Sequence, residues 1–372
     1  IKDVGGQNGS LPDAVTYLDL YRVGKVEQLG VADRWRRNHA AKSIGALIGV
    51  RAGGELFTLD LHEKLHGPHG LIAGMTGSGK SEFIQSMLLS LAINYHPDEV
   101  SFVLIDYKGG GMANVFSNSS YALPHVAGKI TDIDGNQIQR SLYSLRAEIE
   151  RRKQIFARLQ IQNINDYHKL RDRGEVQEPL PHLLVVADEF AELQSNQPDF
   201  MAELKSAARV GRTLGIHLIL ATQKPSGVVN DQIWANSRFH ICLKVQDRQD
   251  SMEMLHHPDA GRVTQPGRCF IQVGYDEIFE QVQSGYSGAP YVPREEYIDP
   301  ELQTVTLIDN AARMLRSQTG EEKAPKEGTC SQLEAIVRHI DVVGKVCGVT
   351  PYRLWLEPLG DLLPLESIPA YT

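Results

Sequence analysis

The segment Gly74–Ser81 has the residue types and the spacing of a phosphate-binding loop, and we call it the phosphate loop. It follows the pattern G-x-x-x-x-G-K-[ST], with an apolar run before it and the helix-forming run Phe83–Leu91 after it. Glycines let the backbone curl until successive N–H groups point at a phosphate, and the start of a helix adds partial positive charge. A glycine-rich turn without a ligand is the alternative, but the flanking runs favour a site for ATP.

Two side chains of the phosphate loop have specific expected roles. Lys80 is expected to reach the β- and γ-phosphates, and the Ser81 hydroxyl is expected to ligate Mg²⁺. The remaining residues offer mainly their backbone N–H groups. The residues expected to contact the nucleotide are Gly74, Met75, Thr76, Gly77, Ser78, Gly79, Lys80 and Ser81.

Two carboxylates, Asp188 and Glu189, follow the apolar run Leu183–Ala187. A phosphate loop needs a second metal carboxylate at the end of a neighbouring strand, and Asp188 is the expected ligand. Glu189 is the expected general base that accepts a proton from the attacking water. On its own, an apolar run that ends in Asp-Glu is often an ordinary junction between a strand and a turn. Downstream of a phosphate loop, it predicts the second half of a hydrolytic site.

The run Ile216–Thr222 also leads into polar side chains, those of Thr222 and Gln223. A parallel sheet presents its ligand at the carboxyl ends of its strands, so these two residues are placed to sense the γ-phosphate or to orient water. Ordinary polar residues at a strand end are the alternative.

The arginine that phosphoryl transfer often requires is less clearly marked in the sequence. Such an arginine stabilises the charge of the transition state and is often supplied by a neighbouring subunit. Arg209, Arg212 and Arg238 are the candidates, and we prefer Arg212. For each of them, a surface ion pair is the alternative.

The elements that must position these residues follow a pattern typical of an α/β fold with a mostly parallel sheet, in which strand-like runs alternate with helix-length segments. Strands are predicted at 69–73, 100–106, 183–188, 216–222 and 239–245, and a terminal hairpin at 268–273 and 278–282. A long helix is predicted between the second and third strands, because apolar residues recur there at helical spacing. These apolar residues are Ile138, Leu142, Leu145, Ile149, Phe156 and Leu159.

The same predicted helix carries a local excess of basic residues. They are Arg146, Arg151, Arg152, Lys153 and Arg158. Glu148 and Arg152 can pair at a spacing of four residues. We expect this side of the helix to be a solvated outer face, and a surface for nucleic acid or a partner is the alternative.

The chain is predicted to have three parts. Residues 1–60 form an N-terminal extension of short strands and turns, with Trp35–Asn38 in a short helix or turn. Residues 61–300 form the domain that carries the phosphate loop, and residues 301–372 form a C-terminal linker. In that linker a helical stretch is expected after Pro300 and a last helix around Leu333–Ile340, whose apolar residues recur at helical spacing.

The composition excludes some classes of protein. Hydrophobic residues make up 42% and charged residues 23% of the chain, which is typical of a globular protein. No apolar stretch approaches the roughly 20 residues that a membrane helix needs. The net charge of −8 argues against a surface covered with basic residues for nucleic-acid binding. The four cysteines lack zinc spacing, and we expect buried or free thiols. Both ends resemble cuts through a longer polypeptide.

The phosphate loop and three later segments resemble the ATPases of the FtsK/SpoIIIE family. The later segments are Asp188–Phe190, Arg209–Gly215 and Ile216–Gln223. Other stretches are similar to the EssC/EccC ATPases of type VII secretion within that family, namely Gly67–Gly70, Asp106–Gly111, Leu123–Val126 and the tail motif Leu354–Leu359. One departure is Lys224, where the family commonly has arginine; lysine keeps the charge but loses the planar fork that an intersubunit contact could use.

The resemblance implies a RecA-like module, the first of several tandem ATPase modules in a motor. The parent protein would be anchored on the cytoplasmic side of a membrane, within a secretion complex that exports small helical proteins. The module would act in a homo-oligomer, a hexameric ring in the assembled state, and would not bind nucleic acid. Two alternatives are a DNA-translocating motor of the same family and a regulatory module that binds ATP without hydrolysing it in isolation.

Overall fold

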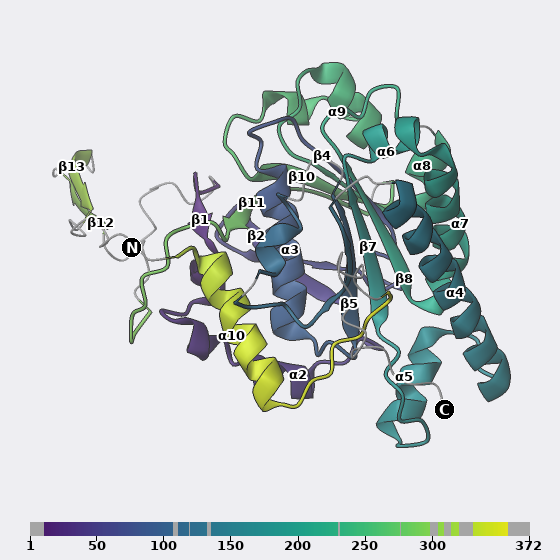
Figure 1. The fold of residues 1–372 in the computed structure, drawn as a ribbon. Coiled ribbons are helices and arrows are strands. Elements are labelled where there is room, and N and C mark those ends of the chain that lie inside the picture. Colours follow the sequence, from purple (N-terminus) through teal and green to yellow (C-terminus); the bar gives the residue numbers. More distant parts are fainter. Residues whose placement is uncertain are drawn as a thin grey trace.

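The computed structural model describes most of the chain, namely residues 11–106, 111–118, 120–131, 135–229, 231–275, 277–297, 304–308, 314–319 and 330–355. One large twisted sheet lies between helices on both of its faces (Figure 1). Its strand order is β3-β2-β11-β10-β9-β4-β8-β7-β5-β6, and β1 pairs with β11 beside this path. A separate two-stranded sheet is made of β12 and β13.

The strands of the large sheet are β1 (Val15–Thr16), β2 (Gly45–Arg51), β3 (Leu56–Asp60), β4 (Gly70–Ala73), β5 (Val100–Asp106), β6 (Val126–Ile130), β7 (His182–Asp188), β8 (Ile216–Thr222), β9 (Phe239–Cys242), β10 (Arg268–Val273) and β11 (Ile278–Tyr286). The small sheet contains β12 (Thr304–Ile308) and β13 (Met314–Thr319).

The α-helices are α1 (Tyr17–Tyr21), α2 (Val31–Arg37), α3 (Lys80–Asn94), α4 (Gly135–Leu159), α5 (Ile164–Asp172), α6 (Phe190–Asn196), α7 (Pro198–Leu214), α8 (Asp231–Asn236), α9 (Arg248–Leu255) and α10 (Gln332–Val346). Short 3₁₀ turns occur at η1 (Val26–Leu29), η2 (Asn114–Phe116) and η3 (Asp259–Arg262).

Six neighbouring strands, β9, β4, β8, β7, β5 and β6, run parallel to one another. Every residue of β5, β7 and β8 is buried, as expected where helices cover both faces of a parallel sheet. One apolar core lies on the face covered by α3 and α10, and a second core lies on the face covered by α4 and α7 (Figure 1). The carboxyl ends of these parallel strands therefore form one rigid edge.

On the other side of β9, the pairs of β9 with β10, β10 with β11, β11 with β2 and β2 with β3 are antiparallel, whereas β1 pairs in parallel with β11. The predicted hairpin is confirmed, because β10 pairs with β11 in antiparallel register. Strands β2 and β3 extend this part of the same sheet, and they belong to the N-terminal residues. The helix expected near Trp35 is confirmed as α2. The division at residues 60 and 300 stays a prediction.

Two expectations about secondary structure need correction. The helical stretch expected after Pro300 is wrong, because Thr304–Ile308 and Met314–Thr319 are strands. The run Thr304–Ile308 is rich in β-branched residues, which favour strands. The strand Val126–Ile130 was not expected, because Gly128 and Lys129 interrupt its short apolar pattern. Pairing with β5 stabilises it as a strand.

The last helix is confirmed as α10, and the tail that follows it crosses to β6. The backbone N–H of Leu354 donates to the carbonyl of Ala127 at 2.9 Å. A Cβ atom on Gly128 would lie 2.5 Å from the ring of Trp355, so the glycine is needed for this close approach. Residues 356–359 of the tail motif lie outside the described residues.

The prediction that the basic residues of the long helix are exposed to solvent is wrong at one position. Arg152 on α4 is fully buried rather than solvated. Its guanidinium donates to Glu148 at 2.7 Å, to the Leu214 carbonyl at 2.7 Å and to the Pro181 carbonyl at 2.8 Å. The expected pairing of Glu148 with Arg152 is confirmed. Arg152 therefore fastens α4 to the end of α7 and to the segment that enters β7.

Among the described residues, no helix combines the length and the apolarity that crossing a membrane requires. The four cysteines carry free thiols, as expected, and two of them, Cys242 and Cys269, are buried.

Candidate functional site

The phosphate loop lies between the end of β4 and the start of α3, which begins at Lys80. Gly77 and Gly79 have φ angles of 79° and 89°, in the left-handed region that favours glycine. A Cβ atom on Gly79 would also lie 2.8 Å from the backbone nitrogen of Gly267. The two glycines thus permit the curl of the loop, and Gly79 also permits its close contact with the turn before β10.

The body of the loop is anchored to the neighbouring strands by backbone hydrogen bonds. The N–H of Gly74 donates to the carbonyl of Thr222 at 3.2 Å, and the N–H of Met75 donates to the carbonyl of Lys244 at 2.8 Å. Because β8 and β9 flank β4, these bonds fix the loop from both sides. The loop is therefore preformed for a ligand.

Lys80 is buried between the two carboxylates that the sequence pointed to. Its Nζ donates to Asp188 Oδ1 in a short contact and to Glu189 Oε1 at 2.8 Å. All three side chains are less than a tenth exposed. The structure thus brings together residues from the starts of α3 and α6 and the end of β7. A lysine in this position has its charge balanced before any phosphate arrives.

Asp188 has further acidic neighbours. It lies opposite Asp106 in the parallel register of β5 and β7. Burial raises the pKa of Asp188, Lys80 lowers it, and the carboxylates of Glu189 and Asp106 raise it again, so that the pKa lies above its ordinary value. A divalent cation would relieve the repulsion between these carboxylates.

Glu189 has an uncommon backbone conformation for a residue with a side chain. Its φ is 54°, in the left-handed region, and it lies directly before α6. Such a conformation costs an L-residue about 1–2 kcal/mol and tends to occur at functional sites. This backbone conformation directs the Glu189 carboxylate toward Lys80 instead of into solvent. The carboxylate accepts a hydrogen bond from Lys80 Nζ.

Gln223 lies beside these carboxylates, and Thr222 faces a local turn. The Gln223 N–H donates to Glu189 Oε2 at 3.4 Å, and its side-chain oxygen accepts from the Thr76 hydroxyl at 3.0 Å. The Thr222 hydroxyl instead donates to the Lys224 carbonyl and accepts from the Lys224 N–H, both at 3.2 Å. Gln223 is thus the better placed of the two to contact a γ-phosphate or a water molecule.

The candidate arginines do not meet the phosphate loop within one chain. Arg212 is at the end of α7, directly before β8 begins, and its side chain is 57% exposed at 3.9 Å from Glu63. Arg238 directly precedes β9 and pairs with Glu277 at 2.8 Å. Both lie at the amino ends of their strands, whereas the phosphate loop lies at the carboxyl ends. At about 3.3 Å per residue, the 7 residues of β8 span about 23 Å and the 4 residues of β9 span about 13 Å. Arg209 lies one turn before Arg212 on α7. A role in a neighbouring subunit stays a prediction for all three.

A pocket of about 510 Å³ opens over the phosphate loop. Loop residues from Met75 to Ser81 and the side chain of Gln223 line it. The lining also contains residues that sequence reasoning missed, namely Ala14, Val15, Pro266, Gly267, Gln283, Ser284, Gly285 and Tyr286. No motif marks them, because β1 and β11 meet the loop only in the folded chain. A pocket of this size accommodates a nucleotide.

The residues present fit ATP and Mg²⁺. Among the described residues, the Ser78 hydroxyl is buried without a hydrogen-bond partner, at the centre of the loop. The Ser81 side chain lines the pocket in the first turn of α3, near the helix N-terminus. Ser81 and Asp188 offer the hydroxyl and carboxylate oxygens that Mg²⁺ prefers. The loop would hold the phosphates, and these two side chains would hold the cation.

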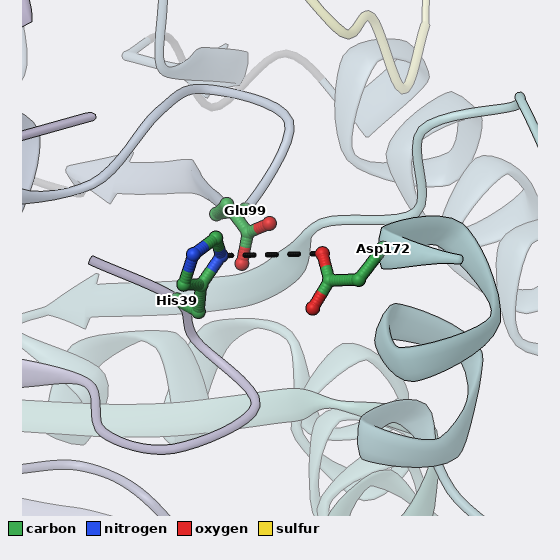
Figure 2. A group of neighbouring side chains, drawn as sticks. All are labelled: His39, Glu99 and Asp172. Carbon is green, nitrogen blue, oxygen red and sulfur yellow. Dashed lines mark ion pairs between the residues drawn. The ribbon is translucent and has the colours of Figure 1, made fainter. Parts of the chain in front are cut away.

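A second group of ligand-type side chains lies elsewhere. His39, Glu99 and Asp172 come from three separate segments, with potential ligand atoms within 4.8 Å of one another (Figure 2). Glu99 Oε2 already accepts hydrogen bonds from the Ala40 N–H at 2.8 Å and from His168 at 3.1 Å. Glu99 directly precedes β5, at the sheet edge opposite the phosphate loop. This group is therefore separate from the nucleotide pocket, and its contacts tie three segments together.

Comparisons with known proteins identify relatives of this chain. The model of the FtsK/SpoIIIE family matches residues 31–227. The chain is 50% identical over 363 residues to the type VII secretion system protein EssC of Staphylococcus aureus (strain Mu50 / ATCC 700699), which covers 96% of this chain and 24% of that protein. It is 45% identical to the ESX secretion system protein YukB of Bacillus subtilis (strain 168), covering 98% of this chain and 24% of that protein.

A solved structure is also similar. The cytoplasmic domain of the Thermomonospora curvata type VII secretion ATPase EccC matches with a TM-score of 0.74 and 27% identity, over 94% of this chain and 37% of that chain. The expected P-loop NTPase fold with a mostly parallel sheet is confirmed. The chain spans about a quarter of the length of the curated relatives it matches, at 24%.

Proposed function

Because the chain belongs to the FtsK/SpoIIIE family, we propose that it is an ATP-hydrolysing motor module of a type VII protein secretion apparatus. The contact of Lys80 with Asp188 and Glu189 is the observation that carries the hydrolytic part of this proposal. It brings a lysine and two carboxylates together, which supports the proposed roles of Lys80 in phosphate binding, Asp188 as a metal ligand and Glu189 as the general base. The pocket above them is large enough for ATP.

Each side chain has a role in the proposed reaction. Bound Mg²⁺ neutralises charge that develops on the phosphates. Lys80 leaves its carboxylate partners to bind the β- and γ-phosphates, which frees Glu189 to accept a proton from water. Gln223 orients that water, since its backbone N–H donates to Glu189 and its side-chain oxygen accepts from Thr76. Thr222 supports the turn that holds Gln223 in place.

The module works within a longer protein. Its curated relatives are about four times as long, which supports further modules in the same chain. We place it first among tandem ATPase modules, on the cytoplasmic side of a membrane secretion complex that exports small helical proteins. A hexameric ring would let Arg209, Arg212 or Arg238 reach the site of a neighbouring subunit, since none reaches its own.

ATPase activity measured against protein concentration tests this proposal. We expect Mg²⁺-dependent turnover that rises more than linearly with concentration, that Lys80→Ala abolishes, and that DNA leaves unchanged. Glu189→Gln is the matched variant, because it should keep ATP binding and lose turnover. A rate that DNA stimulates and that falls steeply with salt would instead identify a DNA-translocating motor.

The contact of Lys80 with Asp188 and Glu189 also favours a second function. Lys80 is neutralised by two carboxylates, so ATP must compete with them for it. An isolated module could therefore bind ATP without turnover, and assembly would then release Glu189. Nucleotide binding without hydrolysis by this chain, with hydrolysis by a longer chain that contains the following modules, would identify this regulatory behaviour.

A further inference from the structure

The nucleotide pocket has two different ends. Gln223 and Thr76 mark one end, close to Glu189, where the γ-phosphate must lie for water to attack it. The rest of a nucleotide must extend away from that end. The same pocket is also lined by the apolar side chains of Val15 and Tyr286, together with Pro266 and the hydroxyl-bearing Ser284. Apolar faces with a few polar groups are what a planar aromatic base requires.

Part of that lining comes from the N-terminal strap, which we define as residues 11–16. Val15 and Thr16 form β1 and pair in parallel with Gly285 and Tyr286 of β11. This pairing is only two residues long. It needs another attachment to stay in place, since so short a strand offers few backbone hydrogen bonds.

Arg268 provides that attachment. Its Nη2 donates to the Pro12 carbonyl at 2.7 Å and to the Leu11 carbonyl at 3.4 Å. Its Nε donates to the Gln283 side chain at 3.2 Å, and the arginine side chain is only 13% exposed. A planar guanidinium suits these several acceptors, which a lysine could not satisfy together.

The residue before Arg268 touches the phosphate loop. The Gly267 N–H donates to the Ser78 carbonyl at 2.8 Å, and the Gly267 carbonyl accepts from the Ser284 N–H at 3.0 Å. Two consecutive residues thus contact the loop, β11 and the strap. Phosphate binding at the loop and docking of the strap therefore both depend on Gly267 and Arg268.

We propose that the N-terminal strap, held by Arg268, forms the base-binding wall of the nucleotide pocket, with the base against Val15 and Tyr286. This inference rests on the proposed function, since the phosphate loop must bind the triphosphate. Arg268 is then a positioning residue that acts through the strap.

Calorimetric titration with two ligands tests the inference. MgATP occupies the whole pocket, whereas magnesium tripolyphosphate occupies the phosphate loop alone. We expect Tyr286→Ala and Arg268→Ala to weaken MgATP about tenfold, the size of a lost aromatic stacking contact, and to leave tripolyphosphate affinity unchanged. Arg36→Ala is the matched control, an exposed arginine on α2 that pairs with Asp33 one turn away.

The outcomes separate the two proposals. If the unaltered chain binds neither ligand, the proposed function fails and this inference fails with it. If the chain binds both ligands but the two variants bind MgATP normally, only this inference fails. Equal weakening of both ligands would show a general loss of structure and would also overturn it. Tyr286 is about half exposed, so Tyr286→Ala is not expected to disturb folding.

Hydrogen exchange gives a second readout. The amides of Val15 and Thr16 should exchange more slowly with MgATP than with tripolyphosphate, because only the nucleotide reaches the strap. Arg268→Ala should remove this difference. Equal exchange with the two ligands in the unaltered chain would refute contact between the base and the strap.

Discussion

Replacing Arg152 tests how the long helix is attached to the rest of the domain. The guanidinium is fully buried and donates to Glu148, Leu214 and Pro181 at 2.7–2.8 Å. Arg152→Met retains most of the side-chain volume but leaves two buried carbonyls without their donors. Glu148 keeps a partner, because Arg151 Nε donates to it at 2.8 Å.

The expected loss of stability is larger for Arg152→Met than for a control substitution at the neighbouring residue. Each buried acceptor left without a donor costs about 1–3 kcal/mol, and breaking a buried ion pair from one side costs about 3–5 kcal/mol. We therefore expect Arg152→Met to lower the free energy of unfolding by about 3–5 kcal/mol. Arg151→Met is the matched control, and we expect about 1 kcal/mol, because Arg151 is one third exposed. Arg152→Lys should lie between them, since lysine keeps the charge but loses the fork.

Urea unfolding followed by circular dichroism measures these differences, with the m-value compared among variants. The result that would refute the reasoning is an Arg152→Met variant no less stable than Arg151→Met. It would mean that water or a shift of α4 satisfies the two carbonyls at little cost.

Three further outcomes can be measured. Gly79→Ala should weaken nucleotide binding more than Gly77→Ala in a titration, because only a Cβ on Gly79 meets the Gly267 backbone, at 2.8 Å; equal effects would contradict this. Glu189→Gln should lower the ATPase rate about 10²–10⁴-fold without weakening ATP binding, and an unchanged rate would exclude Glu189 as the base. Burial lowers the pKa of His125 to about 3, so the unfolded state binds a proton first as pH falls. Between pH 7 and pH 5, the free energy of unfolding of the unaltered chain should therefore fall by about 2 kcal/mol more than that of His125→Phe. Urea unfolding at both pH values measures this difference, and the same pH dependence in the two proteins would contradict the reasoning.

Local patterns predicted most of the parallel sheet and the phosphate loop. The strand at 100–106 was predicted with the bounds that the structure has, because its apolar run is continuous and turn residues bound it. The strand Val126–Ile130 could not be predicted, since it depends on pairing with β5 rather than on its own residues. Arg152 shows the same limit, because a charged residue on a helix is normally exposed, and only its three buried acceptors explain its position.

The sequence by itself determined the kind of chemistry, because a phosphate loop is a local structure that its own glycines, lysine and serine specify. It also predicted that Asp188 ends one strand and that Gln223 follows another. Only the tertiary structure decided that Lys80 lies between Asp188 and Glu189, that the candidate arginines lie far from their own loop, and that residues 14 and 15 and β11 close the pocket. These contacts join segments up to about 270 residues apart, so they depend on sheet pairing and core packing, which no local pattern records.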